Sequence, residues 1–273
     1  MIKQVLFLIF TLSLSVSFAQ DSLSYSWKEV ISYKVAEDET WTVDLLENIY
    51  VSDGGMVHKY DSSGVIRFSQ SIKSLGNTTH LIPVNTMKII HFSEEQQTLC
   101  YFDNTLSSMN DCIDLTLENI VSAEFVCGSS QPNKVWVLDN FNSTLSLLSL
   151  DNLQQRQEVG NLRGILDINN ITQIRERYNR LFVLDKSKGI YVFDLYATLM
   201  EFIPGESIQQ LDAFEGTLFT VSDKTLFVRS LTTGEEFGVH LPVDGVSEVN
   251  YRNQFFYLRS KGNVHKYELQ FSK

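Results

Sequence analysis

The sequence predicts an all-β protein: a β-propeller of six four-stranded blades whose ring is closed by a strand from the N-terminal end. Short apolar segments recur with steps of 40, 46, 46, 37 and 37 residues, and they begin at Ile49, Ile89, Val135, Leu181, Leu218 and Phe255. Repeats of this length built from strands are typical of propeller blades. The segments are rich in Val, Ile, Phe and Tyr and are separated by Gly, Asn, Asp and Ser, which favours strands and turns over helices.

The pattern inside the segments supports the same fold. Residues 181–184 and 255–258 are apolar at every position instead of alternating between apolar and polar. A strand has this pattern when both faces of its sheet are covered. In a propeller each blade lies between two others, so its middle strands are expected to lose water on both sides.

Each first strand is followed by a partner strand, and the two together delimit the blades. The partner segments of the first and last repeats are nearly identical, VHKYD at residues 57–61 and VHKYE at 264–268. A charged segment, Arg175-Glu176-Arg177, leads into the fourth blade. The predicted blades span residues 42–71, 79–117, 119–161, 166–205, 207–241 and 246–271. The third repeat is long, so a ring of seven blades remains the alternative.

The last repeat ends near Phe271 and lacks an outer strand. An open ring would leave sheet edges unpaired, which propellers avoid by closure. We therefore predict that the stretch from Trp27 to Ala36 supplies the missing outer strand of the last blade. Deletion of residues 21–40 should then unfold the protein cooperatively.

Blades one and four carry a more specific pattern. Residues 49–53 (IYVSD) are followed by 57–64 (VHKYDSSG), and residues 181–185 (LFVLD) by 190–194 (IYVFD). These units resemble the NHL-repeat family of six-bladed propellers, in which a strand ending in Asp precedes a second strand ending in Phe-Asp or Tyr-Asp and a turn that often holds Gly. Blade one keeps this glycine at Gly64, whereas blade four has Thr198 nearby. The resemblance covers about half of the chain and implies a six-bladed ring.

Residues 1–19 have the features of a signal peptide. Lys3 is followed by an apolar run of about 14 residues from Val5 to Phe18, too short for a comfortable membrane span, and the segment ends in Ser17-Phe18-Ala19. The ending resembles export signals of the Bacteroidota type. We predict cleavage after Ala19 or Gln20, with an uncleaved anchor as the alternative. Residues 20–273 then form one propeller domain with no transmembrane segment.

The charge of the chain narrows the possible partners. Without residues 1–19 it has 21 basic and 33 acidic residues and no basic cluster. This balance argues against nucleic acids and anionic membrane surfaces as partners. Together with the export signal, this acidic balance predicts a protein located in the periplasm or on the periplasmic side of the outer membrane. The cell surface is the alternative location.

Two of the three cysteines are placed for a disulfide. Cys100 lies on the second strand of blade two and Cys112 on the strand expected at residues 111–115, equidistant from a turn centred on Leu106. Cross-strand neighbours in a hairpin come close enough to bond, and exported proteins meet an oxidising compartment. We predict a Cys100–Cys112 disulfide and a buried Cys127 thiol. The alternative is three unpaired buried cysteines.

Other polar residues recur at equivalent positions without forming a recognisable reactive site. Strand-ending acids could form a carboxylate ring for a cation, or could accept hydrogen bonds from turn amides, which we favour; they are Asp53, Asp139, Asp185 and Asp223. His58 and His265 are equivalent in neighbouring blades, which repeat homology explains without a shared metal. No phosphate-binding loop or nucleophile elbow is present, and we predict no catalytic, cofactor-binding or metal-binding residues.

Three functions remain open at this point. The sequence favours a non-catalytic scaffold or accessory subunit that binds another envelope or outer-membrane protein through loops on a rigid ring. A metal-dependent enzyme similar to propeller lactone hydrolases would need polar residues converging on a central ion, and the candidates are Glu124, Asn170, Asp212 and Asn250. A carbohydrate or small-ligand binder using the central channel is the third. The fold alone does not choose among them.

Overall fold

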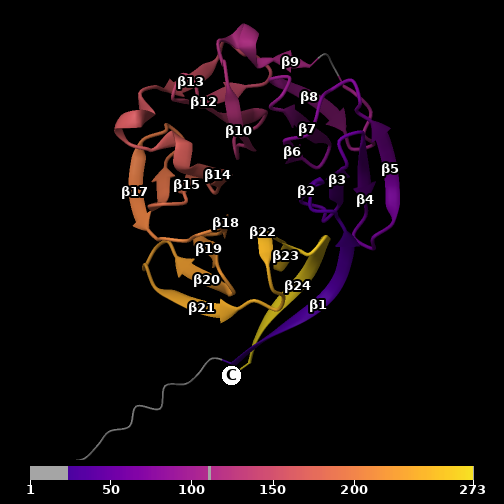
Figure 1. Ribbon diagram of the computed structural model, residues 1–273, viewed down its shortest axis with the longest axis vertical. Coiled ribbons are helices and arrows are strands. Elements are labelled where there is room, and N and C mark those ends of the chain that lie inside the picture. Colours follow the sequence, from indigo (N-terminus) through magenta and orange to yellow (C-terminus); the bar gives the residue numbers. More distant parts are fainter. Residues whose placement is uncertain (1–23, 110–111, 273) are drawn as a thin grey trace, which may run out of the picture.

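Each strand pair marked by the repeats forms the middle of a four-stranded antiparallel sheet. The computed structural model describes residues 24–109 and 112–272, and six such sheets are arranged in a ring (Figure 1). In five of the sheets the strands follow in chain order from the centre of the ring to its outside (Figure 1). The predicted all-β, six-bladed propeller is confirmed.

The first three blades follow one another along the chain. Blade one contains β2 (Thr40–Val43), β3 (Ile49–Ser52), β4 (Met56–Tyr60) and β5 (Ile66–Ser71). Blade two contains β6 (His80–Asn85), β7 (Lys88–Ser93), β8 (Thr98–Asp103) and β9 (Ile113–Asp114). Blade three contains β10 (Ala123–Gly128), β11 (Lys134–Asp139), β12 (Thr144–Ser149) and β13 (Arg156–Val159).

The last three blades complete the ring. Blade four contains β14 (Ile171–Arg177), β15 (Arg180–Asp185), β16 (Gly189–Phe193) and β17 (Leu199–Pro204). Blade five contains β18 (Gln210–Phe214), β19 (Thr217–Ser222), β20 (Thr225–Ser230) and β21 (Glu236–His240). Blade six contains β22 (Val246–Arg252), β23 (Phe255–Ser260), β24 (Asn263–Ser272) and β1 (Ser24–Lys34).

The longer repeats do not hide a seventh blade. Their extra residues form short 3-10 helices in the loops between blades: η1 (Leu115–Glu118), η2 (Leu162–Gly164) and η3 (Ile168–Asn170). The strand expected at 111–115 is shorter than predicted, because the Asp114 carboxylate accepts a hydrogen bond from the Thr116 amide and caps η1. Blade two therefore ends in a two-residue outer strand.

The ring is closed as predicted, by a strand from the N-terminal end. β1 pairs with β24 from Ser24 opposite Ser272 to Lys34 opposite Asn263, and Figure 1 shows the two strands side by side. Trp27 on β1 packs edge-on against Phe256 and Tyr267, and its indole N–H donates a hydrogen bond to the His240 carbonyl of blade five. The closing strand thus joins two blades as well as completing one.

The core is divided among the spaces between blades. Each of six clusters of buried apolar side chains contains residues from two neighbouring blades. On β15, Leu181 and Val183 pack towards blade three, while Phe182 and Leu184 pack towards blade five. Successive side chains of a strand point to opposite faces, so an uninterrupted apolar run is what this sandwich requires.

The predicted signal peptide, residues 1–19, lies outside the described residues. No helix in the described part of the chain has both the length and the apolar character that a membrane span needs.

Candidate functional site

The innermost strands of all six blades surround a central channel. Residues of β2, β6, β10, β14, β18 and β22 line a cavity of about 840 Å³ there. Because the sheets are antiparallel, the loops that link one blade to the next lie at one face of the ring, which we call the linker face. The turns that follow the innermost strands lie at the opposite face.

Three arginines gather in the channel towards the opposite face. Arg175 and Arg177 lie two positions apart on β14, so their side chains share a face of the strand. Arg252 ends β22, and all three surround the buried carboxylate of Asp212 on β18. The nitrogen–oxygen distances to Asp212 are 3.7 Å from Arg175, 3.2 Å from Arg177 and 3.4 Å from Arg252.

The Asp212 carboxylate has a backbone hydrogen bond of its own and does not accept hydrogen bonds from all the arginine N–H groups around it. Its Oδ2 accepts a hydrogen bond of 2.8 Å from the Tyr251 amide. Buried nitrogens of Arg175 (Nε) and Arg177 (Nε and Nη2) have no hydrogen-bond partner among the described residues. Glu176 does not supply one, because it lies on the other side of β14 and accepts hydrogen bonds from Trp136 and Ser130. The cluster therefore sets three guanidinium groups around one carboxylate.

Burial and mutual repulsion act on these charges in opposite ways. Burial would raise the pKa of Asp212, but the neighbouring Arg177, Arg175 and Arg252 outweigh it and lower that pKa to about 2. Burial, followed by repulsion from Arg177, lowers the pKa of Arg252. Burial also lowers the pKa of Arg177, against the attraction of Asp212. Positive charge is thus in excess around Asp212, although acidic residues line other parts of the channel.

Aromatic side chains border the arginines on the same side of the channel. Phe214 lies edge-on to Tyr178 and to Tyr251, with ring centroids 5.5 Å and 5.2 Å apart, respectively. All three line the cavity, and the Tyr178 side chain is exposed. This end of the channel therefore combines cations with flat apolar surfaces.

A second concave region lies on the linker face of blades three and four. It is a cleft of about 660 Å³, lined by the turn after β11 and by the loop that carries η2 and η3. Large apolar side chains are exposed on these two loops and on the neighbouring η1 loop: Leu117 (79%), Val121, Phe141 (68%) and Ile165. We call these four residues the apolar cluster.

Asp139 ties the loops of the apolar cluster together. Its carboxylate accepts hydrogen bonds from the amides of Val121, Ser122 and Phe141, which come from two separate loops. The third loop is attached through Ser143, whose carbonyl accepts from the Leu162 amide and whose hydroxyl accepts from Arg163. The exposed apolar residues therefore sit on a fixed surface, despite being in loops.

The other strand-ending acids behave mainly as turn residues. Asp53 accepts from the amides of Gly55 and Met56, and Asp185 accepts from the amide and hydroxyl of Ser187. Asp223 lies in its turn with a left-handed φ of 53°. These contacts favour the structural interpretation over a cation-binding ring. Among the described residues there is no group of three or more His, Cys, Asp or Glu side chains placed to hold a metal ion.

The four residues considered for a metal-dependent enzyme do not converge. Glu124 accepts a hydrogen bond from Asn140, and Asn170 donates to Asp167 at the linker face. Asp212 is occupied by the arginines, and Asn250 lies on the neighbouring β22. Only Asp212 and Asn250 come from adjacent innermost strands, so the set lacks the shared centre that a bound ion requires.

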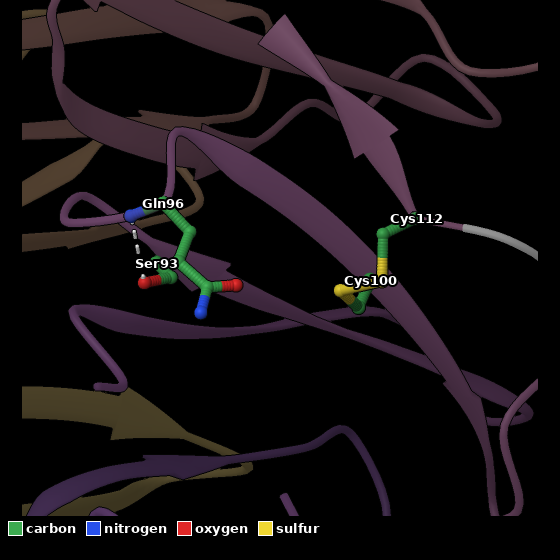
Figure 2. Close-up of a disulfide and its surroundings, with 4 residues drawn as sticks. All are labelled: Ser93, Gln96, Cys100 and Cys112. Carbon is green, nitrogen blue, oxygen red and sulfur yellow. Dashed lines mark hydrogen bonds between the residues drawn. A yellow bond between two sulfur atoms is a disulfide. The ribbon is translucent and has the colours of Figure 1, made fainter. Parts of the chain in front are cut away.

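The cysteines lie where the hairpin geometry placed them. Figure 2 shows Cys100 of β8 joined to Cys112, with their Cα atoms 4.3 Å apart, and Cys127 is a buried free thiol on β10. Burial raises the pKa of the Cys127 thiol to about 12.

His58 and His265, which occupy equivalent positions in blades one and six, have separate hydrogen-bond partners. The partner of His58 is Ser69, and the partner of His265 is Glu29.

The arginine cluster is the feature that sequence reasoning missed. Arg175-Glu176-Arg177 stood out only as a charged segment leading into blade four. The available signal was two arginines at alternate positions of a strand next to the centre of a ring, where side chains are usually apolar or small. Their convergence with Arg252 and Asp212 depends on three different blades meeting at the channel.

Comparison with solved structures places the chain among β-propellers. The WD40 domain of Pan2 from Neurospora crassa has 13% sequence identity and a TM-score of 0.58, covering 83% of this chain and 73% of that one. BamB from Moraxella catarrhalis has 12% identity and a TM-score of 0.57, covering 89% and 100%. Virginiamycin B lyase from Staphylococcus aureus has 9% identity and a TM-score of 0.59, covering 90% and 99%.

At such low identities these similarities show the fold alone. No protein-family model matches the sequence, and no curated protein matches it. The resemblance of blades one and four to NHL repeats therefore stays a prediction about the type of propeller.

Proposed function

We propose that this chain is an exported, non-catalytic propeller that binds another protein of the cell envelope as a scaffold or accessory subunit. The observation that carries the proposal is the apolar cluster on the linker face of blades two to four. Its four large side chains are exposed on three loops that hydrogen bonds fix to one another. Exposed apolar residues gathered beside a cleft are typical of protein-interaction sites.

The polar lining of the cleft indicates what kind of segment fits. Arg163 and Lys188 line it, in a chain whose acidic residues outnumber its basic ones by 33 to 22. Asp167 lines the cleft as well, and its carboxylate already accepts a hydrogen bond from Asn170. A partner segment with apolar side chains next to a carboxylate would match both the apolar cluster and these two cations.

The proposed location rests on the sequence. The signal-peptide pattern of residues 1–19 supports export, and the acidic balance of the rest supports a partner other than nucleic acid or an anionic membrane surface. We infer that the partner is a periplasmic or outer-membrane protein. The fold shared with BamB is compatible with this role but adds nothing about partners.

The test is crosslinking of the tagged full chain in its own envelope, followed by affinity purification and mass spectrometry. The Phe141→Asp variant should lose a stoichiometric partner that the wild type retains, because a charge would have to be buried in the interface. Phe237→Asp, which alters an exposed aromatic residue on the outer strand of blade five, is the matched control and should retain the partner.

The same partner, once purified, should bind the wild type and Phe237→Asp with equal affinity and Phe141→Asp at least about tenfold more weakly, as expected for an interface anchor. Recovery of the protein alone, or of the same partner with both variants, would overturn the proposed role of the linker face.

A further inference from the structure

We propose that the arginine cluster in the channel binds the oxyanion of a small organic ligand, a carboxylate or a phosphate, whose ring lies against Tyr178, Phe214 and Tyr251. This site is separate from the proposed protein-binding surface, because it lies towards the opposite face and is built from the innermost strands of blades four, five and six.

The chemistry of the guanidinium group points to this ligand class. Its N–H groups form a planar fork that matches two oxygens of a carboxylate or phosphate, and it remains protonated at neutral pH. Here Arg175 and Arg177 have buried N–H groups without a hydrogen-bond partner among the described residues. A bound oxyanion would accept these hydrogen bonds and would reduce the positive charge that Asp212 leaves uncompensated.

The fold does not account for the cluster by itself. Placing three partly buried cations around one carboxylate is costly, and each buried N–H left without an acceptor adds to that cost. Blades one to three close the same ring with β2, β6 and β10, and none of these three strands carries Lys or Arg. Arginine N–H groups left without an acceptor at one side of a channel are therefore better explained by a ligand than by folding.

The two ends of the channel also differ in charge. At the linker face the cavity is lined by Glu37, Asp38 and Glu39, which would repel an anion. At the opposite face the lining includes the arginines and the exposed Tyr178. Asp44 also lies there, but its carboxylate accepts hydrogen bonds from Asn48 and Tyr50. An anion is therefore expected to enter from the opposite face.

The probes are benzoate, phenyl phosphate, inorganic phosphate and the neutral benzyl alcohol, titrated into the full chain by isothermal calorimetry. Benzoate alone binding would identify a carboxylate site, and phenyl phosphate alone a phosphate site, while binding of both would support the shared oxyanion chemistry. Inorganic phosphate should bind about tenfold more weakly than phenyl phosphate, because it lacks the ring that contacts the aromatic side chains, and tenfold corresponds to about 1.4 kcal/mol. If none of the anions binds, or if benzyl alcohol binds as well as they do, the proposal is wrong.

Single substitutions test whether the anion affinity depends on these arginines or only on the overall charge of the protein. Arg177→Gln should weaken anion binding by at least about tenfold, since a charge-assisted hydrogen bond would be lost. Arg177→Lys should recover only part of the affinity, because lysine keeps the charge without the fork. Arg67→Gln, on the outer strand of blade one, is the control and should bind as the wild type does.

Asp212→Asn is expected to change the anion affinity in the opposite direction from Arg177→Gln. It removes the one carboxylate that competes for the arginines, so anion affinity should rise if the variant is folded by circular dichroism. Equal binding by wild type and Arg177→Gln, with both folded, would place the anion elsewhere. Phe141→Asp should lose the protein partner and still bind the anion as the wild type does. This result would show that the arginine cluster and the linker face are separate binding sites.

Discussion

The two halves of the ring build the channel wall differently. The innermost strands of blades four, five and six carry six charged residues, namely Arg175, Glu176, Arg177, Asp212, Glu248 and Arg252. The described innermost strands of blades one, two and three carry one Asp or Glu and no Lys or Arg, and that residue is Glu124 on β10. Blades one to three also bury charged side chains, Asp44, Lys59 and Asp139, but each of these has hydrogen-bond partners within the fold.

This contrast distinguishes the apolar packing that forms the ring from the charged residues that form the candidate site. Packing between blades is apolar throughout, with one cluster in each space between neighbours. The charged residues of the innermost strands are concentrated on one side of the channel, where burial costs free energy unless the charge is paired. The charged half should therefore be the more sensitive to the loss of a single carboxylate.

The largest effect is expected from removing the strand that closes the charged half. A chain that starts at Val35 lacks β1 and leaves β24 as an unpaired edge. It should show no single cooperative thermal transition when measured by circular dichroism, because the outer edge of blade six would be unpaired and Trp27 would no longer join blades five and six. A chain that starts at Asp21 retains β1 and is the control. An unchanged melting curve for the shorter chain would contradict closure by β1.

Replacing Asp212 tests the buried charge directly. Asp212→Asn should lower the free energy of unfolding by about 3 kcal/mol, because three partly buried arginines would lose their one fully buried counter-ion. Asp244→Asn, which removes an exposed partner of Lys224, should have little effect. Denaturant titrations at neutral pH compare the two variants. Equal effects would show that the buried cluster is no more sensitive than the surface.

In the apolar half, the disulfide compensates for a short strand. β9 has two residues, and Cys100–Cys112 connects the same two segments next to it. Replacing both cysteines by serine should lower the free energy of unfolding by about 3 kcal/mol, the value expected for a loop of this length. Peptide mapping without reduction should find the two joined and Cys127 free. Both thiols free in protein purified without reductant would contradict the pairing.

The smallest effect concerns buried histidine in blade two. His91 is fully buried, neither of its ring nitrogens has a hydrogen-bond partner in the part of the chain that the structure describes, and burial lowers its pKa to about 4. The unfolded chain binds this proton below about pH 6.5 and the folded chain only below about pH 4, so stability is full above the first value and falls towards the second. At pH 5 the loss is about 2 kcal/mol.

His91→Leu should flatten that part of the stability profile, measured by denaturant unfolding between pH 7.5 and 4.5. His80 remains in the variant and should preserve part of the slope, because burial lowers its pKa to about 4 as well. An unchanged slope would mean that His91 is not kept neutral by burial.

The sequence by itself determined the repeat and therefore the ring. The spacing of apolar segments such as residues 181–184, and the missing outer strand after Phe271, were enough to predict six blades and their closure by the N-terminal strand. Local patterns carry this information, because strand periodicity and turn residues depend on neighbours along the chain. The hairpin position of Cys100 and Cys112 could be predicted for the same reason.

The tertiary structure alone decided which polar residues meet. Arg177, Asp212 and Arg252 lie on three blades and come together only because the ring brings the ends of their innermost strands to one channel. The apolar cluster likewise depends on Asp139 bridging two loops. No sequence period records such contacts, since they arise from the closure of the ring and not from any one repeat.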